Sequence, residues 1–228
     1  MLKIEELNVS YNTAPVLQNV NAQFATGNVT GIIGLNGAGK TTLFNSIAGI
    51  IKIQSGRLLL NGNPLHHKHI AYLETVNYFY PLLTGREYLS VFDQTNIRYK
   101  EENLKLLLHL PLNERIENYS TGMRKKLALM ALLKQEKSVY IFDEPFNGLD
   151  LESNKLLELM INNLKEQGKT ILLSSHILDP LLQVCNTILL LEQGRFVKSY
   201  SPDEFHTIEE ALFSHYKKQA AQQLQHSM

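Results

Sequence analysis

Apolar and polar side chains alternate along the first thirty residues of the chain. A two-residue period of this kind is typical of strands that bury one face. The apolar positions are Leu2, Ile4, Leu7, Val9, Val16, Val20 and Phe24. Residues 29–33 form a short, mostly β-branched run, and after a glycine-rich turn the apolar residues of 41–50 take helical spacing. These patterns predict the edge of an antiparallel sheet, followed by a strand, a loop and a helix.

Helical patterns dominate the middle of the chain, over residues 76–133, with leucine-rich amphipathic stretches at 103–110 and 123–133. Beyond them strands and helices alternate. Strands are expected at 139–142, 170–173 and 187–191, and helices at 152–167 and 177–184. Alternation of this kind predicts a parallel sheet covered by helices. The predicted fold class is α/β, with an N-terminal antiparallel β subdomain and an inserted α-helical lobe.

The chain is expected to form a single domain over 1–228, with the lobe at 76–133 and a C-terminal helix and tail at 208–228. Lys+Arg and Asp+Glu are both 22, so no global field favours nucleic acid. The single cysteine, Cys185, cannot form an internal disulfide and fits a reducing compartment. No export signal and no apolar run of roughly 20 residues is visible, so any membrane spans must come from another chain.

A glycine-rich loop is the first candidate site. Residues 34–41 read GLNGAGKT, which matches G-x-x-x-x-G-K-[ST] between a hydrophobic strand and an amphipathic helix. Glycines let main-chain N–H groups point at phosphate oxygens, and Lys40 and the Thr41 hydroxyl suit phosphate and Mg²⁺. The predicted nucleotide-binding residues here are Asn36, Gly37, Ala38, Gly39, Lys40, Thr41 and Thr42. Alone, this P-loop leaves open a kinase, a GTPase, a motor or a transporter.

Two carboxylates, Asp143 and Glu144, end a hydrophobic strand about a hundred residues later. A parallel sheet brings strand C-termini to one edge, where Asp143 could hold Mg²⁺ and Glu144 could activate water. The bland alternative is a pair of strand-capping acids. His176 follows the next predicted strand and could reach the γ phosphate, while Asp150 opens a helix and could also serve only as its N-cap.

Taken in order, these segments resemble the ATP-binding subunits of ABC transporters over nearly the whole chain. Residues 119–124, YSTGMR, occupy the slot of that family's L-S-G-G-Q signature. The resemblance implies MgATP hydrolysis in a head-to-tail dimer, formed with itself or a related ATPase, in which Ser120, Thr121 and Gly122 contact the ATP of the other protomer. It also implies that Tyr11 stacks on adenine, although Tyr11 also fits an edge-sheet aromatic. Asp150 would join the two sites, with His176 as the switch histidine.

Two departures from the family pattern concern residues near the expected site. A glutamine usually follows the strand that leads into the lobe, whereas this chain offers Glu74 or Thr75, and Glu74 is the expected substitute near the metal. The signature also has Thr121 and Met123 in place of a glycine and the glutamine. Ser120 and Gly122 remain, so the phosphate contact is expected to survive.

Aromatic side chains concentrate between residues 72 and 99, where the resemblance implies docking of a transmembrane permease subunit. Phe79 and Tyr80 are the expected anchors, with ordinary packing as the alternative. The expected function is therefore an ATPase subunit, peripheral on the cytoplasmic face of a membrane, that powers export. The alternatives are an ABC ATPase that acts on nucleic acid or ribosomes, and a regulatory module that only binds nucleotide. The neutral charge gives no nucleic-acid footprint.

Overall fold

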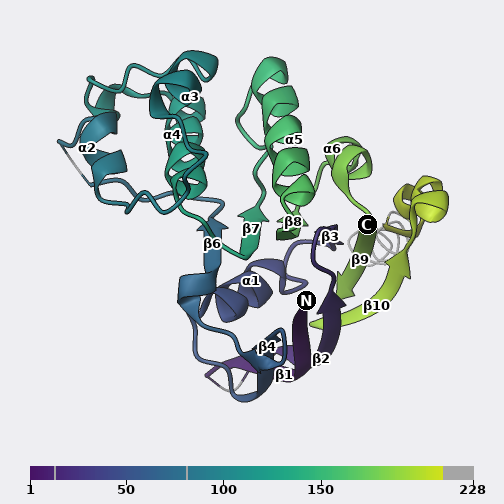
Figure 1. Ribbon diagram of the computed structural model, residues 1–228. Coiled ribbons are helices and arrows are strands. Elements are labelled where there is room, and N and C mark those ends of the chain that lie inside the picture. Colours follow the sequence, from purple (N-terminus) through teal and green to yellow (C-terminus); the bar gives the residue numbers. More distant parts are fainter. Residues whose placement is uncertain (13, 81, 213–228) are drawn as a thin grey trace, which may run out of the picture.

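The computed structural model describes residues 1–12, 14–80 and 82–212. Two sheets and three groups of helices make up this part of the chain (Figure 1). Of the C-terminal helix and tail predicted at 208–228, residues 208–212 are helical. The remainder of that prediction lies outside the described residues.

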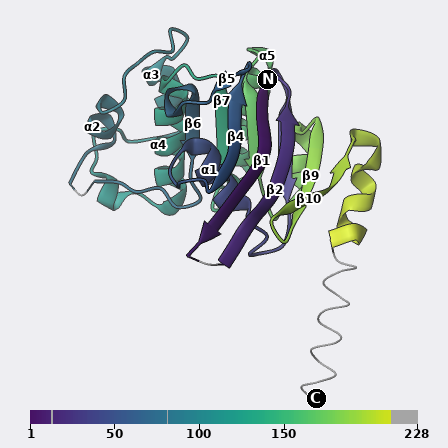
Figure 2. The same cartoon turned by 90° about the horizontal axis from the view of Figure 1, so that it is seen from below.

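The smaller sheet is antiparallel and has the strand order β2-β1-β4-β5. Its strands are β1 (Leu2–Tyr11), β2 (Ala14–Phe24), β4 (Ser55–Leu60) and β5 (Asn63–Pro64). The alternating apolar side chains of β1 and β2 face inwards, and the long pair they form is evident in Figure 2. The buried positions that the pattern identified are Leu2, Ile4, Leu7, Val9, Val20 and Phe24. Val16 is only half-buried and its neighbour Leu17 is buried instead, because register shifts interrupt the period of two.

The larger sheet has six strands in the order β10-β9-β3-β8-β7-β6. They are β3 (Val29–Ile33), β6 (Ile70–Leu73), β7 (Val139–Asp143), β8 (Thr170–Ser174), β9 (Thr187–Glu192) and β10 (Arg195–Tyr200). All neighbours are parallel except β10, which runs antiparallel to β9. Every residue of β3, β7 and β8 is buried, as expected for strands covered on both faces.

Helices cover both faces of the larger sheet. α1 (Lys40–Ala48) packs between the two sheets through Leu43, Phe44 and Ile47. α5 (Leu151–Glu166) and α6 (Leu178–Val184) pack on the opposite face. The predicted α/β core with its N-terminal antiparallel sheet is confirmed.

The inserted lobe follows β6 and contains α2 (Gly85–Ser90), α3 (Glu101–Leu107) and α4 (Thr121–Lys134). These helices share a hydrophobic cluster of their own, and α4 also packs on the main core. α3 begins two residues earlier than the stretch predicted at 103–110, because acidic Glu101 and Glu102 occupy a first turn where the helix dipole favours them. It ends before His109, whose φ of 53° is left-handed.

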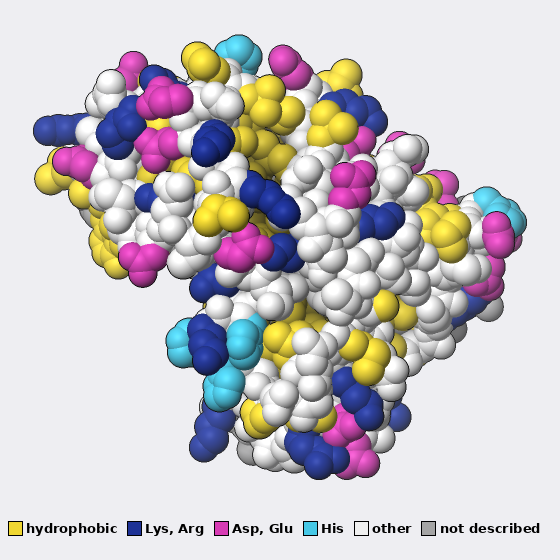
Figure 3. Space-filling model, in the orientation of Figure 1, with side chains coloured by type: hydrophobic (Ala, Val, Ile, Leu, Met, Phe, Trp, Pro, Cys, Tyr) yellow, Lys and Arg dark blue, Asp and Glu magenta, His cyan; other side chains and the backbone are white. Residues whose placement is uncertain are grey.

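Short 3₁₀ turns complete the chain at η1 (His67–His69), η2 (Ile116–Asn118) and η3 (Pro202–Thr207). On the face drawn in Figure 3, cationic and anionic side chains are interspersed over the lobe. Apolar side chains gather in the hollow between the lobe and α5, where Leu104, Leu133 and Leu156 line a cavity.

Candidate nucleotide site

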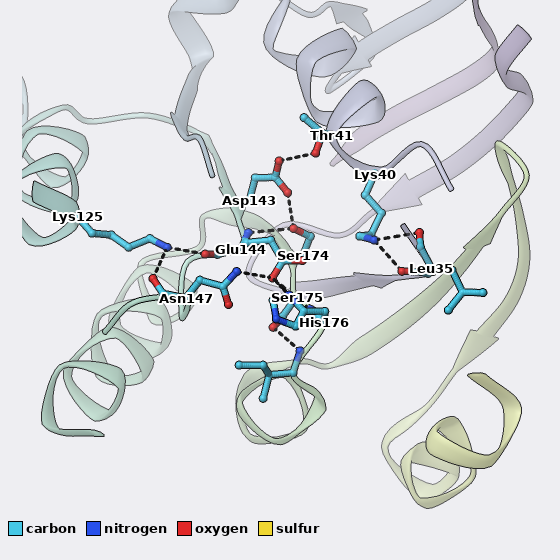
Figure 4. Close-up of polar contacts among 12 residues, drawn as sticks. Leu35, Lys40, Thr41, Lys125, Asp143, Glu144, Asn147, Ser174, Ser175 and His176 are labelled. Carbon is cyan, nitrogen blue, oxygen red and sulfur yellow. Dashed lines mark hydrogen bonds and ion pairs between the residues drawn. The ribbon is translucent and has the colours of Figure 1, made fainter. Parts of the chain in front are cut away.

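The site lies at one edge of the larger sheet, where β3, β8 and β7 end side by side. Three loops begin there, and they bring together residues that are more than a hundred positions apart in sequence (Figure 4). They line a pocket of about 530 Å³. The lining residues are Val16, Asn36, Gly37, Ala38, Gly39, Lys40, Thr41, Thr42, Thr75, Asp143, Glu144 and His176. All seven predicted residues of the glycine-rich loop therefore border the same pocket as Asp143, Glu144 and His176.

Glycine is required at two points of the loop after β3. A Cβ on Gly34 would lie 2.2 Å from the main-chain oxygen of Leu191, so no side chain fits there. Gly39 has a φ of 108° and is the N-cap of α1 without a side-chain hydrogen bond to the first turn. The N–H groups at the start of α1 therefore have no side-chain cap from Gly39 and border the pocket, as an anion site requires.

Lys40, the first residue of α1, folds back over the loop. Its Nζ donates to the main-chain oxygen of Gly34 at 2.7 Å and to that of Leu35 at 3.4 Å. Burial lowers the pKa of Lys40, while the nearby charges of Glu144 and Asp143 act in the opposite direction. The ammonium group therefore lies between the loop and two carboxylates, within the pocket where a phosphate would bind.

Asp143 is buried at the end of β7 and has hydroxyl partners on two elements. Thr41 donates its hydroxyl to Oδ2 of Asp143 at 2.8 Å, and Ser174 at the end of β8 donates to Oδ1. A hydroxyl and a carboxylate oxygen so close together form the hard-oxygen donor pair that Mg²⁺ prefers. Within the part of the chain that the structure describes, no group of three or more His, Cys, Asp or Glu side chains could hold a metal alone.

Glu144, which follows Asp143 directly, has a main chain in the left-handed region, with a φ of 52°. Such a conformation costs a non-glycine residue roughly 1 kcal/mol or more and persists where surroundings hold it. Oε2 of Glu144 lies 2.9 Å from Nδ1 of His176 and accepts the His176 main-chain N–H at 3.2 Å. The structure thus brings together the two predicted catalytic side chains.

The signature turn lies at the start of α4. Ser120 is the N-cap, and its Oγ accepts the N–H of Met123 at 3.2 Å. A Cβ on Gly122 would lie 3.1 Å from the main-chain oxygen of Gly148, so the turn packs closely on the segment that follows Glu144. None of Ser120, Thr121 and Gly122 borders the P-loop pocket. Asp150 caps α5 by accepting the N–H of Ser153 at 2.8 Å.

Two residues that were predicted to contact the nucleotide or metal bound by their own chain do not line the pocket. Tyr11 ends β1 and is half exposed, and the pocket is lined instead by Val16 from the paired strand. Glu74 does not line the pocket either, whereas Thr75 does. Beyond the end of β6 the chain turns; burial raises the pKa of Tyr72 and of Tyr88, and the charge of Glu74 adds to both effects. Thr75 thus borders the pocket where Glu74 was expected, and a role of Glu74 near a metal stays a prediction.

Sequence reasoning gave no role to Ser174, Asn147 or Lys125, which all contact the catalytic segment. Ser174 accepts the N–H of Glu144 at 3.0 Å, and Asn147 Nδ2 lies 3.4 Å from Glu144 Oε2. Lys125 donates to the main-chain oxygens of Glu144 and Asn147. The sequence did contain one indication for Lys125: its spacing from Leu129 and Leu132 places all three residues on the same, buried face of the helix.

A family model described as ABC transporter matches residues 17–147, from β2 through the P-loop and the signature turn to the loop after Glu144. The chain belongs to the ABC transporter family. Within it, the chain is an ATP-binding subunit and an ABC-type ATPase, and the α/β core is that of a P-loop NTPase. The resemblance inferred from the motifs is therefore confirmed.

Similar proteins cover most of this chain. The ABC-type transporter ATP-binding protein EcsA of Bacillus subtilis is 32% identical, over 85% of this chain and 84% of its own length. A solved ATP-binding subunit of an ABC transporter is 29% identical with a TM-score of 0.81, covering 93% of this chain and 94% of its own. The structure of cbiO1 from Clostridium perfringens, part of the ABC transporter complex cbiONQ, is 27% identical with a TM-score of 0.72, covering 92% of each chain.

No helix in residues 1–12, 14–80 and 82–212 is long and apolar enough to cross a membrane.

Proposed function

We propose that this ABC ATPase hydrolyses MgATP in a head-to-tail dimer and thereby powers a separate membrane-spanning subunit. The observation that carries the proposal is the convergence of Lys40, Asp143, Glu144 and His176 on one pocket. Phosphoryl transfer to water requires a cation that binds phosphate, a carboxylate that holds a metal, and a carboxylate with a histidine that position the water.

The glycine-rich loop and Lys40 bind the triphosphate in this proposal. The start of α1 provides N–H groups that Gly39 does not cap with a side chain. The Lys40 ammonium exchanges its two carbonyl acceptors for β and γ phosphate oxygens, which are stronger partners because they are charged. Asn36, Gly37, Ala38 and Thr42 border the phosphates through the same loop.

Thr41 and Asp143 are the residues that would hold Mg²⁺. Their oxygens lie 2.8 Å apart and offer two donors, which suits an ion that takes its other ligands from phosphates and water. When bound, Mg²⁺ neutralises charge that develops on the phosphate oxygens. Ser174 keeps the second oxygen of Asp143 occupied and so fixes the carboxylate plane.

Glu144 is the proposed general base, and His176 is its partner. The carboxylate is largely enclosed, and its Oε2 accepts the His176 main-chain N–H. The imidazole is more than half exposed on the pocket rim, where it can contact the γ phosphate and the attacking water. The two side chains therefore suit a water that enters in line with the γ phosphate.

A second copy, or a related ATPase, completes the site in this proposal. Ser120, Thr121 and Gly122 lie outside the P-loop pocket of their own chain, so they are available to the ATP of another protomer. Lys126 reaches Asp150 at 3.8 Å, which connects the signature helix with the start of α5. We also propose that Tyr11, half exposed at the end of β1, stacks on adenine.

The proposed docking surface for the membrane subunit is the exposed aromatic stretch after β6. Tyr78 and Tyr80 are 75% and 58% exposed and lie edge to face, 5.7 Å apart. Phe79 points inwards instead and packs on Tyr88 at 4.9 Å, so the anchors expected at Phe79 and Tyr80 become Tyr78 and Tyr80. The description of cbiO1 as part of a transporter complex supports a partner of this kind.

Replacing Tyr78 and Tyr80 together by alanine tests this surface. We expect loss of copurification with the membrane subunit and unchanged ATPase activity of the isolated chain, because neither ring borders the P-loop pocket. Leu159→Ala, which removes a side chain 65% exposed on α5, is the matched control. Copurification of the double variant at the level of the control would remove the docking proposal.

The same proposal places the chain on the cytoplasmic face of the membrane, with export as the direction of transport. The relatives do not establish export, and some of them are named energy-coupling factor transporter ATP-binding proteins, so export stays a prediction. Its test is ATP-driven movement of the transported molecule in inverted membrane vesicles, where export appears as accumulation inside.

Glu144→Gln tests the central assignment. The amide keeps the size of the side chain but cannot take a proton, so turnover should fall about 1,000-fold. ATP affinity should stay within about threefold, and an ATP-dependent dimer should accumulate in size-exclusion chromatography. Glu152→Gln, on the exposed first turn of α5, is the control. Normal turnover in Glu144→Gln would refute the assigned base.

A further inference from the structure

Lys125 is a buried cation close to the proposed catalytic carboxylate. It lies in the second turn of α4 and is 6% exposed. Its Nζ donates to the main-chain oxygen of Glu144 at 2.6 Å and to that of Asn147 at 2.9 Å (Figure 4). One ammonium group from the lobe therefore reaches two carbonyls of the loop that follows β7.

The two acceptors are the two ends of one turn. Asn147 N–H donates to the main-chain oxygen of Glu144 at 3.4 Å, and Asn147 Nδ2 approaches the Glu144 carboxylate at the same distance. Because Lys125 binds both carbonyls, it holds the turn closed from outside. If Lys125 moved, the main chain of Glu144 and the Asn147 amide next to the Glu144 carboxylate would both move with it.

The main chain of Glu144 is in the left-handed region, with a φ of 52°. Such a conformation persists only when neighbouring groups determine it. On one side the N–H of Glu144 donates to Ser174 Oγ, and on the other its oxygen accepts from Lys125. These contacts come from the sheet and from the lobe, so the carboxylate direction depends on both parts of the molecule.

Packing alone does not account for a lysine at this place. No acidic oxygen within the described residues forms an ion pair with Lys125, and its Nζ donates to two main-chain carbonyls. An apolar side chain of the same length would fill the volume without burying a charge. What the ammonium adds is two directed hydrogen bonds.

We propose that Lys125 is a positioning residue for Glu144, which fixes the turn 144–147 so that the carboxylate stays against His176 and faces the water. Because Lys125 stands on the helix that begins at the signature turn, a shift of α4 would be transmitted to the carboxylate. The inference rests on the proposed role of Glu144 as the general base.

The test compares two buried lysines of the same helix. Lys134 is 9% exposed and donates to the main-chain oxygen of Leu89 at 2.7 Å, within the lobe and away from the pocket. Lys125→Met should lower kcat about 100-fold with the KM for ATP changed less than about twofold, because the P-loop is untouched while the base is misplaced. Lys134→Met should keep kcat within about twofold of the unaltered protein.

Lys125→Arg supplies the second readout and guards against a folding defect. It keeps a cation with several donors in the same place, so it should recover at least about a tenth of the unaltered kcat. An unchanged kcat in Lys125→Met, or an equal fall in Lys134→Met, would overturn the positioning role. Glu144→Gln separates the two hypotheses. Normal turnover in that variant would refute Glu144 as the general base. An inactive Glu144→Gln together with an active Lys125→Met would refute only the role of Lys125.

Discussion

Two helices of this molecule begin at motifs that we propose bind phosphate, and their first turns are built differently. α1 starts after Gly39, which offers no side chain to its N–H groups, and Lys40 adds a cation. α4 starts after Ser120, whose hydroxyl already accepts an N–H of its own helix. The N–H groups at the start of α1 therefore have no side-chain cap from Gly39 that an anion must displace, whereas an N–H group at the start of α4 already has a partner in its own chain.

The difference matches where each turn lies. The start of α1 borders a pocket that is also lined by Asp143 and Glu144, so one chain holds both the proposed phosphate site and the groups proposed for chemistry. The start of α4 is outside that pocket and packs on the turn after Glu144. In the proposed dimer the P-loop would therefore bind nucleotide within a single chain, whereas the signature turn would contact only the ATP of a second chain.

The largest expected effect separates the two helix starts by their nucleotide affinity. Lys40→Ala removes the charged partner of the phosphates and should weaken ATP binding by the isolated chain about 1,000-fold, or ~4 kcal/mol. Ser120→Ala should leave this affinity unchanged. Titration with a fluorescent ATP analogue measures both variants, and an affinity of Lys40→Ala within threefold of the unaltered protein would contradict the contrast.

A pH-dependent effect should appear on the α4 side. Burial lowers the pKa of Lys125 from 10.5 to about 8, and the charges of Glu144 and Asp143 offset part of that shift. Between these pH values the unfolded chain holds a proton that the folded chain has released, so the free energy of unfolding rises with pH. The free-energy cost of burying the charged Lys125 ammonium is fully present below pH 8 and is absent near pH 10.5. The free energy of unfolding therefore rises by about 3 kcal/mol across this range.

Urea unfolding of the unaltered protein and of Lys125→Met at pH 7.5 and pH 10.5 measures this effect. The difference in free energy of unfolding between the two proteins should grow in favour of the unaltered protein as pH rises. A difference that stays constant across this range would show that the ammonium carries no burial cost.

The smallest effect concerns the cap of α4. Ser120→Ala removes the hydroxyl that accepts the Met123 N–H and should lower the free energy of unfolding by about 1 kcal/mol. Gly39 makes no such side-chain bond, and Gly39→Ser would add one. We expect little gain in stability from it, because the φ of 108° at this position strains any residue with a side chain. Denaturant titration of both variants checks the contrast, and an unchanged midpoint in Ser120→Ala would contradict it.

The sequence alone predicted the α/β core and the chemistry of the P-loop. Strands such as β7 read as buried because apolar residues run through them without a break, and the loop after β3 has a residue pattern that few other structures require. Local geometry determines both features, so the order of residues was sufficient. The sequence pattern did not choose between the adjacent Glu74 and Thr75, because which of them borders the pocket depends on the course of the chain after β6.

Only the tertiary structure decided what holds Glu144. Its contacts to Ser174, His176 and Lys125 come from residues 19 to 32 positions away, on a neighbouring strand end and on the lobe. No local pattern encodes such distances, because they depend on the order of strands in the sheet and on how α4 packs against it. Sequence determined which groups could do the chemistry, and the packing of the lobe on the sheet determined which of them meet.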